Sequence, residues 1–321
     1  MRRITITLVC LLLSSTSFAL SVDDATGAAP LKPTHSQPKP RPSYSSRERV
    51  RPVYRRPKHE SLQGQQVGKL RLASASALVI DQGSGALLYA KNISTRQPIA
   101  SITKLMTAMV VLDTHQPLDE KISVTEEDVD HIKFSISRLT VGSVLTRFEM
   151  LQLALMSSEN RAASALGRNY PGGTDAFVAA MNNKAKAIGM DNTTFADASG
   201  LDHRNTSTAS DLGRMVGAAY GYDMIRQVST ATSYIVETNN YRPTQYRNSN
   251  ILISNKDWDI GLSKTGFIRE AGHCLVMQAQ ISTRNLIIIL LDGRGKMTRV
   301  GDANRIKKWL EYTQTKNKQV S

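Results

Sequence analysis

Three short groups of side chains in this 321-residue chain could carry out acyl transfer. In the first group, Ser101 and Lys104 are three residues apart. On a helix they would share a face, so that the amine could reach the hydroxyl. A serine hydroxyl is a weak nucleophile until a base takes its proton, and a lysine can act as that base only if its pKa falls. The pair predicts a nucleophile and a general base. The alternative is an N-cap serine beside a solvated lysine.

The surroundings of Ser101 separate it from a second match to the same pattern. Ser36 and Lys39 also lie three apart, but in a proline-rich stretch without helical periodicity. Apolar residues follow Ser101 at helical spacing, namely Ile102, Leu105, Met106 and Met109. We therefore interpret Ser36 as a chance match.

The second group is Ser158-Glu159-Asn160. The Ser158 hydroxyl could relay a proton between Lys104 and a leaving amine, and the Asn160 amide could hold a substrate carbonyl. The alternative is a simple helix start, with Ser157 or Ser158 as the N-cap.

The third group, Lys264-Thr265-Gly266, ends an apparent strand. Its lysine would attract a substrate carboxylate and lower the pKa of Lys104, and Thr265 could hydrogen-bond the same carboxylate. Gly266 would let a ligand approach the backbone, so that an extended substrate could pair with the strand. The alternative is an exposed lysine followed by a turn glycine.

The elements that must position these groups are strands at both ends of the globular sequence and helices between them. A hairpin is predicted from 75–80 and 86–89, and later strands at 260–266, 274–281 and 286–291. Helices are predicted at 101–109, 148–156, 160–166, 174–188, 208–219 and 300–312, with Thr174 as an N-cap and Gly189 as a C-terminal stop. The pattern favours an α/β fold, an α+β sandwich in which the N- and C-terminal parts share one sheet around a helical insertion at about 115–225.

In this order, the three groups match the serine set of penicillin-binding proteins and class A β-lactamases. From about Ala75 to Trp309 the chain resembles the low-molecular-weight penicillin-binding proteins of the D-alanyl-D-alanine carboxypeptidase type. The stretches 155–163, 264–267 and 271–275 are similar to the endopeptidase branch, the penicillin-binding protein 7 type. No histidine pair has a zinc-protease spacing and no G-x-S-x-G elbow occurs in the sequence.

The resemblance implies a β-lactamase/DD-peptidase-like fold with an antiparallel sheet flanked by helices. It implies that Ser101 attacks a D-alanyl carbonyl, with the backbone N–H groups of Ser101 and Phe267 as the oxyanion hole. In the endopeptidase branch the scissile bond joins D-alanine to the D-centre of diaminopimelate in peptidoglycan cross-links. β-Lactams would acylate Ser101, and no metal or cofactor is expected.

Three other functions stay open. A carboxypeptidase that trims stem pentapeptides would use the same residues. A β-lactamase is less favoured, because only Glu159 offers a carboxylate for rapid deacylation. A non-catalytic peptidoglycan-binding protein would need no nucleophile.

Composition adds an expected location. Residues 1–19 have the charged, apolar, small-residue order of a signal peptide cut after Ala19, which predicts export to the periplasm and excludes nucleic acid as a partner. Residues 20–66 are rich in proline and basic residues, so we expect them to be disordered. The net charge is +14, and residues 31–60 carry nine basic against two acidic residues, so they could contact anionic envelope components or act only as a spacer.

The peptidase domain is expected at 67–315, with a tail at 316–321. Signal cleavage removes Cys10 and leaves Cys274 as a buried thiol.

Overall fold

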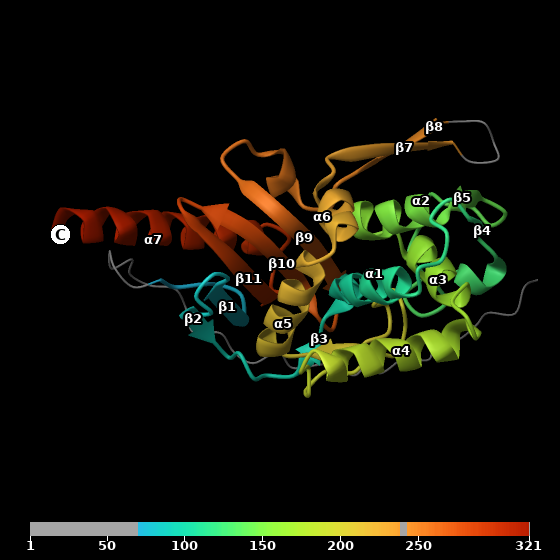
Figure 1. The fold of residues 1–321 in the computed structure, drawn as a ribbon, viewed down its shortest axis with the longest axis horizontal. Helices are drawn as coiled ribbons and strands as arrows, with labels where there is room; N and C mark the ends of the chain where they lie inside the picture. Colours follow the sequence, from blue (N-terminus) through green and yellow to red (C-terminus); the bar gives the residue numbers. More distant parts are fainter. Residues whose placement is uncertain (1–69, 238–242, 321) are drawn as a thin grey trace, which may run out of the picture. The chain divides into compact units, whose positions relative to one another are not determined.

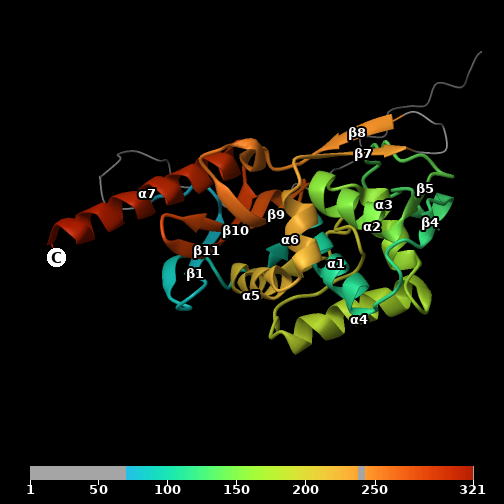
Figure 2. The same cartoon turned by 45° about the horizontal axis from the view of Figure 1, so that its top comes forward.

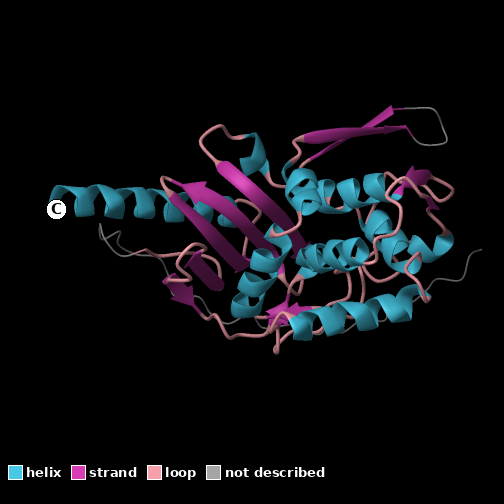
Figure 3. Cartoon of the chain, in the orientation of Figure 1, coloured by secondary structure: helices cyan, strands magenta, loops and turns pink. Residues whose placement is uncertain are grey.

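Near-continuous apolar runs at the C-terminal end of the chain form the centre of a five-stranded antiparallel sheet (Figures 1 and 3). The strand order is β2-β1-β11-β10-β9, so strands from both ends of the domain lie side by side. In β11, Ile288 is paired with Val79 of β1 and Met277 of β10. The strands of this sheet are β1 (Ser76–Asp81), β2 (Leu87–Lys91), β9 (Asp259–Ile268), β10 (Gly272–Ile281) and β11 (Arg284–Gly293). The expected shared sheet is confirmed.

The computed structural model describes residues 70–237 and 243–320, with side chains as far as 313. The expected signal peptide at 1–19 and the expected disordered segment at 20–66 lie outside the described residues. Among the described residues, no helix combines the length and the apolar character needed to cross a membrane.

Helices cover both faces of the sheet, which explains why β11 is apolar without alternation. Alternate β11 side chains enter two separate cores: Ile287, Ile289 and Leu291 lie in one, and Leu286, Ile288 and Leu290 in the other. The first face packs against α5 (Ala209–Tyr220) and the second against α7 (Thr298–Val320).

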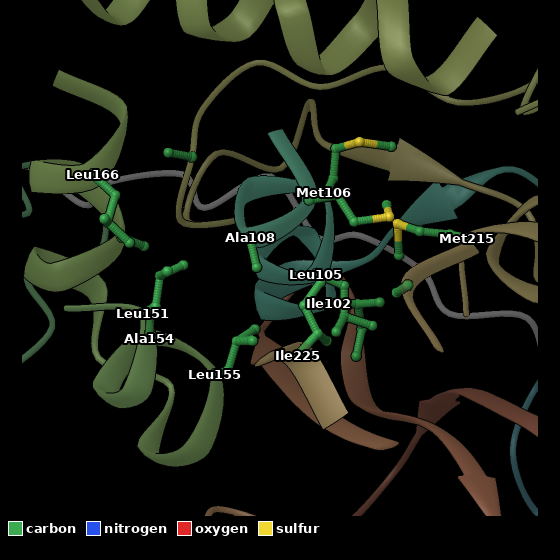
Figure 4. Packing of buried hydrophobic residues seen from close by; sticks show 14 of the residues in the cluster. Ile102, Leu105, Met106, Ala108, Leu151, Ala154, Leu155, Leu166, Met215 and Ile225 are labelled. Atoms are coloured by element: carbon green, nitrogen blue, oxygen red, sulfur yellow. The ribbon is translucent and has the colours of Figure 1, made fainter. Parts of the chain in front are cut away.

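The remaining helices gather around α1 (Lys104–Asp113), in which all residues from Lys104 to Val111 are buried. Figure 4 shows side chains of the preceding turn and α1 between those of neighbouring helices, with the labels Ile102, Leu105, Met106, Leu155, Met215 and Ile225. A helix buried on every side needs an apolar sequence all round. Ser101 thus lies in the turn that leads into the helix at the centre of the core.

Figure 2 labels several of the other elements of this region, among them α2, α3, α4 and α6. The helices and helical turns are η1 (Ala100–Thr103), η2 (Glu126–Asp128), α2 (Arg147–Gln152), η3 (Leu153–Ser157), α3 (Asn160–Arg168), α4 (Gly173–Ala187), α6 (Asp223–Thr230) and η4 (Ile251–Ser254). The short strand pairs are β3 (Gln97–Pro98) with β6 (Thr206–Ser207), β4 (Lys121–Ser123) with β5 (Val144–Thr146), and β7 (Ser233–Glu237) with β8 (Pro243–Arg247).

Local predictions differ from the structure at three places in these elements. Thr174 is not an N-cap: α4 begins at Gly173 after Gly172, and both glycines have positive φ, 77° and 90°, which glycine adopts without a steric penalty. The predicted stop at Gly189 is confirmed by its φ of 76° directly after the helix. Strand β9 continues past Gly266 to Ile268, and α7 continues to Val320 through most of the expected tail.

Candidate active site

The nucleophile candidate lies in a 3₁₀ turn that leads directly into α1. Ser101 belongs to η1, not to the α-helix expected from the sequence, and Lys104 is the first residue of α1. The preceding Ala100 has a φ of +50°, a strained backbone for a residue with a Cβ. The Lys104 side chain is fully buried, and its Nζ donates to Ser101 Oγ at 2.8 Å. A solvated lysine is therefore excluded.

The Lys104 amine is held by three acceptors. Besides Ser101 Oγ, Nζ donates to Asn160 Oδ1 at 2.8 Å and to the Ser199 carbonyl at 2.6 Å. Burial lowers the pKa of Lys104 from 10.5 to about 7, against the opposing charges of Asp197, Glu159 and Asp130. Burial disfavours the ammonium form, so a useful fraction of the amine is neutral near neutral pH. The expected effect of Lys264 on this pKa is not among its causes.

A tight loop presents the Ser199 carbonyl to this amine. The Asp197 carboxylate accepts backbone N–H bonds from Ser199 at 2.9 Å, Gly200 at 2.5 Å and Asp202 at 2.8 Å. Gly200 has a φ of +84°, and a Cβ there would come within 2.0 Å of the Ala100 carbonyl oxygen. The loop therefore packs directly against the backbone that carries the nucleophile.

The second group of residues follows one turn of π-helix, η3, which shifts the chain before α3 begins. Ser158 has a φ of +66°, and Glu159, not a serine, is the N-cap of α3. Asn160 is placed between Lys104 and Ser135, whose Oγ accepts from Asn160 Nδ2 at 3.0 Å. A helix does start in this segment, but neither Ser157 nor Ser158 is its N-cap.

The third group faces Ser158 from the sheet. Lys264 is buried within β9, and its Nζ donates to Ser158 Oγ at 2.8 Å. Burial and the nearby cations of Lys104 and Arg299 hold the pKa of Lys264 well below its ordinary value. Thr265 Oγ1 donates to Ser249 Oγ at 2.7 Å. Ser158 therefore contacts Lys264, whereas the sequence suggested a link to Lys104.

A side chain at position 266 would be crowded, because the sheet meets the turn that carries Ser101 there. A Cβ on Gly266 would lie 3.0 Å from the Ile99 carbonyl oxygen and 3.1 Å from the Ser101 nitrogen. This close approach joins η1 to β9 and places Phe267 at the edge of the same cleft. The predicted oxyanion hole would lie between these two backbones.

These residues line one cleft of about 290 Å³. Its lining residues are Ser101, Ser158, Asn160, Thr265, Gly266, Phe267, His273, Lys296 and Arg299. All three groups predicted from the sequence are brought together, although Lys104 and Lys264 reach the site from below its surface.

Sequence reasoning missed Arg299, which adds a buried cation to the cleft. Its guanidinium donates to the carbonyls of Gly266 at 3.4 Å and Cys274 at 3.1 Å, and burial lowers its pKa. A basic residue at the start of the closing helix was the only signal in the sequence. The Phe267 and His273 rings stack with centroids 4.3 Å apart on the neighbouring rim.

Within the described residues, no group of three or more histidine, cysteine or acidic side chains could hold a metal ion. Cys274 is fully buried, as expected, and burial raises its pKa to about 12. The chemistry available in this cleft is that of a hydroxyl, two amines with lowered pKa, and a guanidinium.

A half-buried serine bonded to a fully buried lysine, with a second buried lysine on a sheet strand, is the arrangement of a serine acyltransferase site. Residues 63–295 match the family model described as D-alanyl-D-alanine carboxypeptidase, peptidase S11. The chain belongs to this family and is a serine-type DD-peptidase.

Known relatives agree with this assignment. The chain is 50% identical over 244 residues to the D-alanyl-D-alanine endopeptidase of Pseudomonas aeruginosa, covering 76% of this chain and 79% of the relative. It is 28% identical to the Streptomyces K15 DD-transpeptidase, with a TM-score of 0.70 over 76% of this chain and 98% of that one. Penicillin-binding protein D2 of Listeria monocytogenes in its ampicillin-bound form is also 28% identical, with a TM-score of 0.65 over 75% and 98%. The expected DD-peptidase fold is confirmed.

Proposed function

We propose that this chain is a penicillin-sensitive serine DD-endopeptidase that hydrolyses D-alanyl–meso-diaminopimelate cross-links in peptidoglycan. The observation that carries the proposal is the buried Lys104 amine, 2.8 Å from Ser101 Oγ, in a cleft with cations at its far end. The preference for cross-links is supported by the 50% identity to a relative that is named an endopeptidase.

In the acylation step, neutral Lys104 takes the proton as Ser101 Oγ attacks the D-alanyl carbonyl carbon. Backbone N–H groups of Ser101 and Phe267 stabilise the oxyanion. When the C–N bond breaks, the Ser158 hydroxyl gives a proton to the leaving amine and regains one from the Lys104 ammonium. Water then attacks the acyl ester with Lys104 as base, which releases the D-alanyl product and restores the Ser101 hydroxyl.

In a cross-link, the carbon that bears the leaving amine also bears a carboxylate, as in a terminal D-alanine. Thr265 and Arg299 line the cleft, and the buried Lys264 bonds to Ser158, so a hydroxyl and two basic side chains are available to this carboxylate. Arg299 is the side chain best suited to this carboxylate, because a guanidinium can bind both of its oxygens. Asn160 would hold the carbonyl of the preceding residue in the acyl donor.

A DD-carboxypeptidase is the second candidate, because the family carries that name and the same residues serve both reactions. A non-catalytic wall-binding protein is disfavoured, because burying two lysines beside a serine costs free energy that a binding site does not require.

The location is also part of the proposal. A signal peptide at 1–19 would deliver the peptidase domain, 67–315, to the periplasm, where cross-linked stem peptides are found. The basic segment 31–60 would then add electrostatic contact with anionic envelope components.

Two measurements test the proposal. A fluorescent penicillin should label the native protein covalently and should not label Ser101→Ala, whereas Ser36→Ala, which alters the other match to the pattern, should label normally. Purified protein should convert cross-linked muropeptide dimers to monomers. Labelling that survives in Ser101→Ala would refute the nucleophile, and removal of terminal D-alanine alone would establish the carboxypeptidase.

A further inference from the structure

An irregular segment beside the cleft, residues 130–139, which we call the strap, is tied to the second group of catalytic candidates. The Asp130 carboxylate accepts N–H bonds from Ile132, Lys133 and Ser135, which fixes the start of the strap. Ser135 Oγ accepts from Asn160 Nδ2 at 3.0 Å. The strap is therefore part of the wall that positions Asn160.

Farther along the strap, two more hydrogen bonds join it to the residues on either side of Asn160. Ser137 Oγ donates to Glu159 Oε1 at 2.6 Å, and the Leu139 carbonyl accepts from Arg161 at 2.7 Å. A substrate that contacts Asn160 would thus lie next to the side chains of the strap.

The strap also reaches the sheet through one ion pair. Lys133 Nζ lies 2.6 Å from Glu270 Oε1, in the turn between β9 and β10, and the side chains are 26% and 34% exposed. A partly exposed ion pair is worth only about 0–1 kcal/mol in stability. Stability alone is thus a weak reason for a bridge at this position.

The pair leaves a donor and an acceptor unused. A lysine ammonium has three N–H donors, and the hydrogen bond described for Lys133 uses one. Glu270 Oε2 is shielded from water and has no hydrogen-bond partner among the described residues. Glu270 Oε1 can accept a second hydrogen bond beside the one from Lys133, because a carboxylate oxygen has two lone pairs. A ligand that carries a carboxylate and an ammonium together would satisfy both groups.

The direction of β9 decides which part of the substrate would meet this pair. A substrate paired antiparallel to β9, with its leaving carboxylate toward Lys264 and Arg299, has its acyl-donor residues toward Phe267 and then Glu270. Glu270 lies three residues beyond Phe267, in the turn that follows the end of β9 at Ile268.

The donor stem carries an amine and a carboxylate in the residue before its D-alanine. Diaminopimelate occupies that position in a stem of the cross-linked wall, so its backbone is displaced by about 3.4 Å toward the β9–β10 turn and its side chain reaches roughly 5–6 Å from that backbone. That side chain ends in a D-centre with an amine and a carboxylate on one carbon.

We propose that Lys133 and Glu270 recognise the zwitterionic D-centre of diaminopimelate in the acyl-donor stem, with Lys133 binding its carboxylate and Glu270 its ammonium. This inference rests on the proposed DD-peptidase function and names a specificity determinant for it. The two residues select the donor and take no part in bond breaking.

The experiment compares donor stems that differ at one group. Synthetic stem-peptide dimers are prepared with a free D-centre in the donor diaminopimelate, or with a carboxamide in place of that carboxylate. We expect kcat/KM of the native protein to be about tenfold higher for the free form, as for a charge-assisted hydrogen bond. Lys133→Met should lose this preference by slowing the free form alone, and Glu270→Gln should lose the preference for a free over an acetylated amine.

Two controls separate recognition from a structural role. Lys184→Met removes an ion pair of similar exposure, Lys184–Asp113 at 2.9 Å, and should keep the native preference. Fluorescent penicillin has no stem peptide, so its acylation rate should be unchanged in Lys133→Met. Equal rates of the native protein on both donors would overturn the inference, and so would parallel loss of penicillin acylation and hydrolysis in Lys133→Met.

Uncross-linked stem pentapeptides that carry the same forms of diaminopimelate are tested as well. A protein that trims pentapeptides but leaves dimers intact would refute the endopeptidase proposal, yet the donor preference would still be measured. The two failures are therefore distinguishable.

Discussion

The pH dependence of acylation tests the Lys104 amine as the base. With a pKa of about 7, half of the Lys104 amines are neutral at pH 7 and about 1% at pH 5. The second-order rate constant for acylation by a fluorescent penicillin should therefore fall about 50-fold between pH 7 and pH 5 and level off above pH 8. A lysine at its ordinary pKa of 10.5 would instead give a rate that rises about tenfold per pH unit up to pH 9.

The assay measures initial labelling rates at penicillin concentrations below saturation, so that the constant reports groups of the free protein. Lys104→Arg serves as the comparison, because a guanidinium keeps its proton across this range. A native rate that is flat from pH 5 to 8, or that still climbs tenfold per unit above pH 8, would refute Lys104 as the base.

The other predictions concern stability and substrate contact. Because the pKa of Lys104 is lowered in the folded state, the unfolded chain binds more protons between about pH 7 and 10.5. In urea titrations, the free energy of unfolding of the native protein should therefore rise by about 2 kcal/mol from pH 7 to 9, and Lys104→Met should lack this rise. Arg299→Leu should slow acylation by a carboxylate-bearing penicillin about 10²-fold and leave its methyl ester unaffected, and equal slowing of both would contradict the carboxylate contact. Gly200→Ala should lower the melting temperature by 10 °C or more, because its Cβ would meet the Ala100 carbonyl oxygen at 2.0 Å, and a normal thermal scan would show that the loop can move. Cys274 should resist a thiol reagent at pH 8 in the native protein and react in denaturant, since burial raises its pKa to about 12.

Local spacing was sufficient to find the residues that share one element. Ser101 and Lys104 are within one helical turn, so their contact follows from helix geometry. The apolar runs that became β10 and β11 were equally visible, since strands buried on both faces have few polar positions.

Contacts between distant segments could not be found in this way. The Ser199 carbonyl bonds Lys104 across 95 positions, and Ser158 pairs with Lys264 across 106. Nothing in the local composition specifies which of several polar residues a buried lysine will meet. The hydrogen bond between Lys264 and Ser158 was therefore not foreseen, and neither was the Lys133–Glu270 bridge.

The order of the strands in the sheet has a consequence for how the protein folds. Strand β1 lies between β2 and β11, and the nucleophile turn packs on β9, so the first and last parts of the domain complete each other. Such long sequence separations make folding slow, because distant segments must meet before either gains a partner. During synthesis, a chain that has emerged only as far as α6 would hold Ser101 and Lys104 without the strand that faces them. The site can thus form only when the C-terminal strands β9, β10 and β11 have joined the sheet.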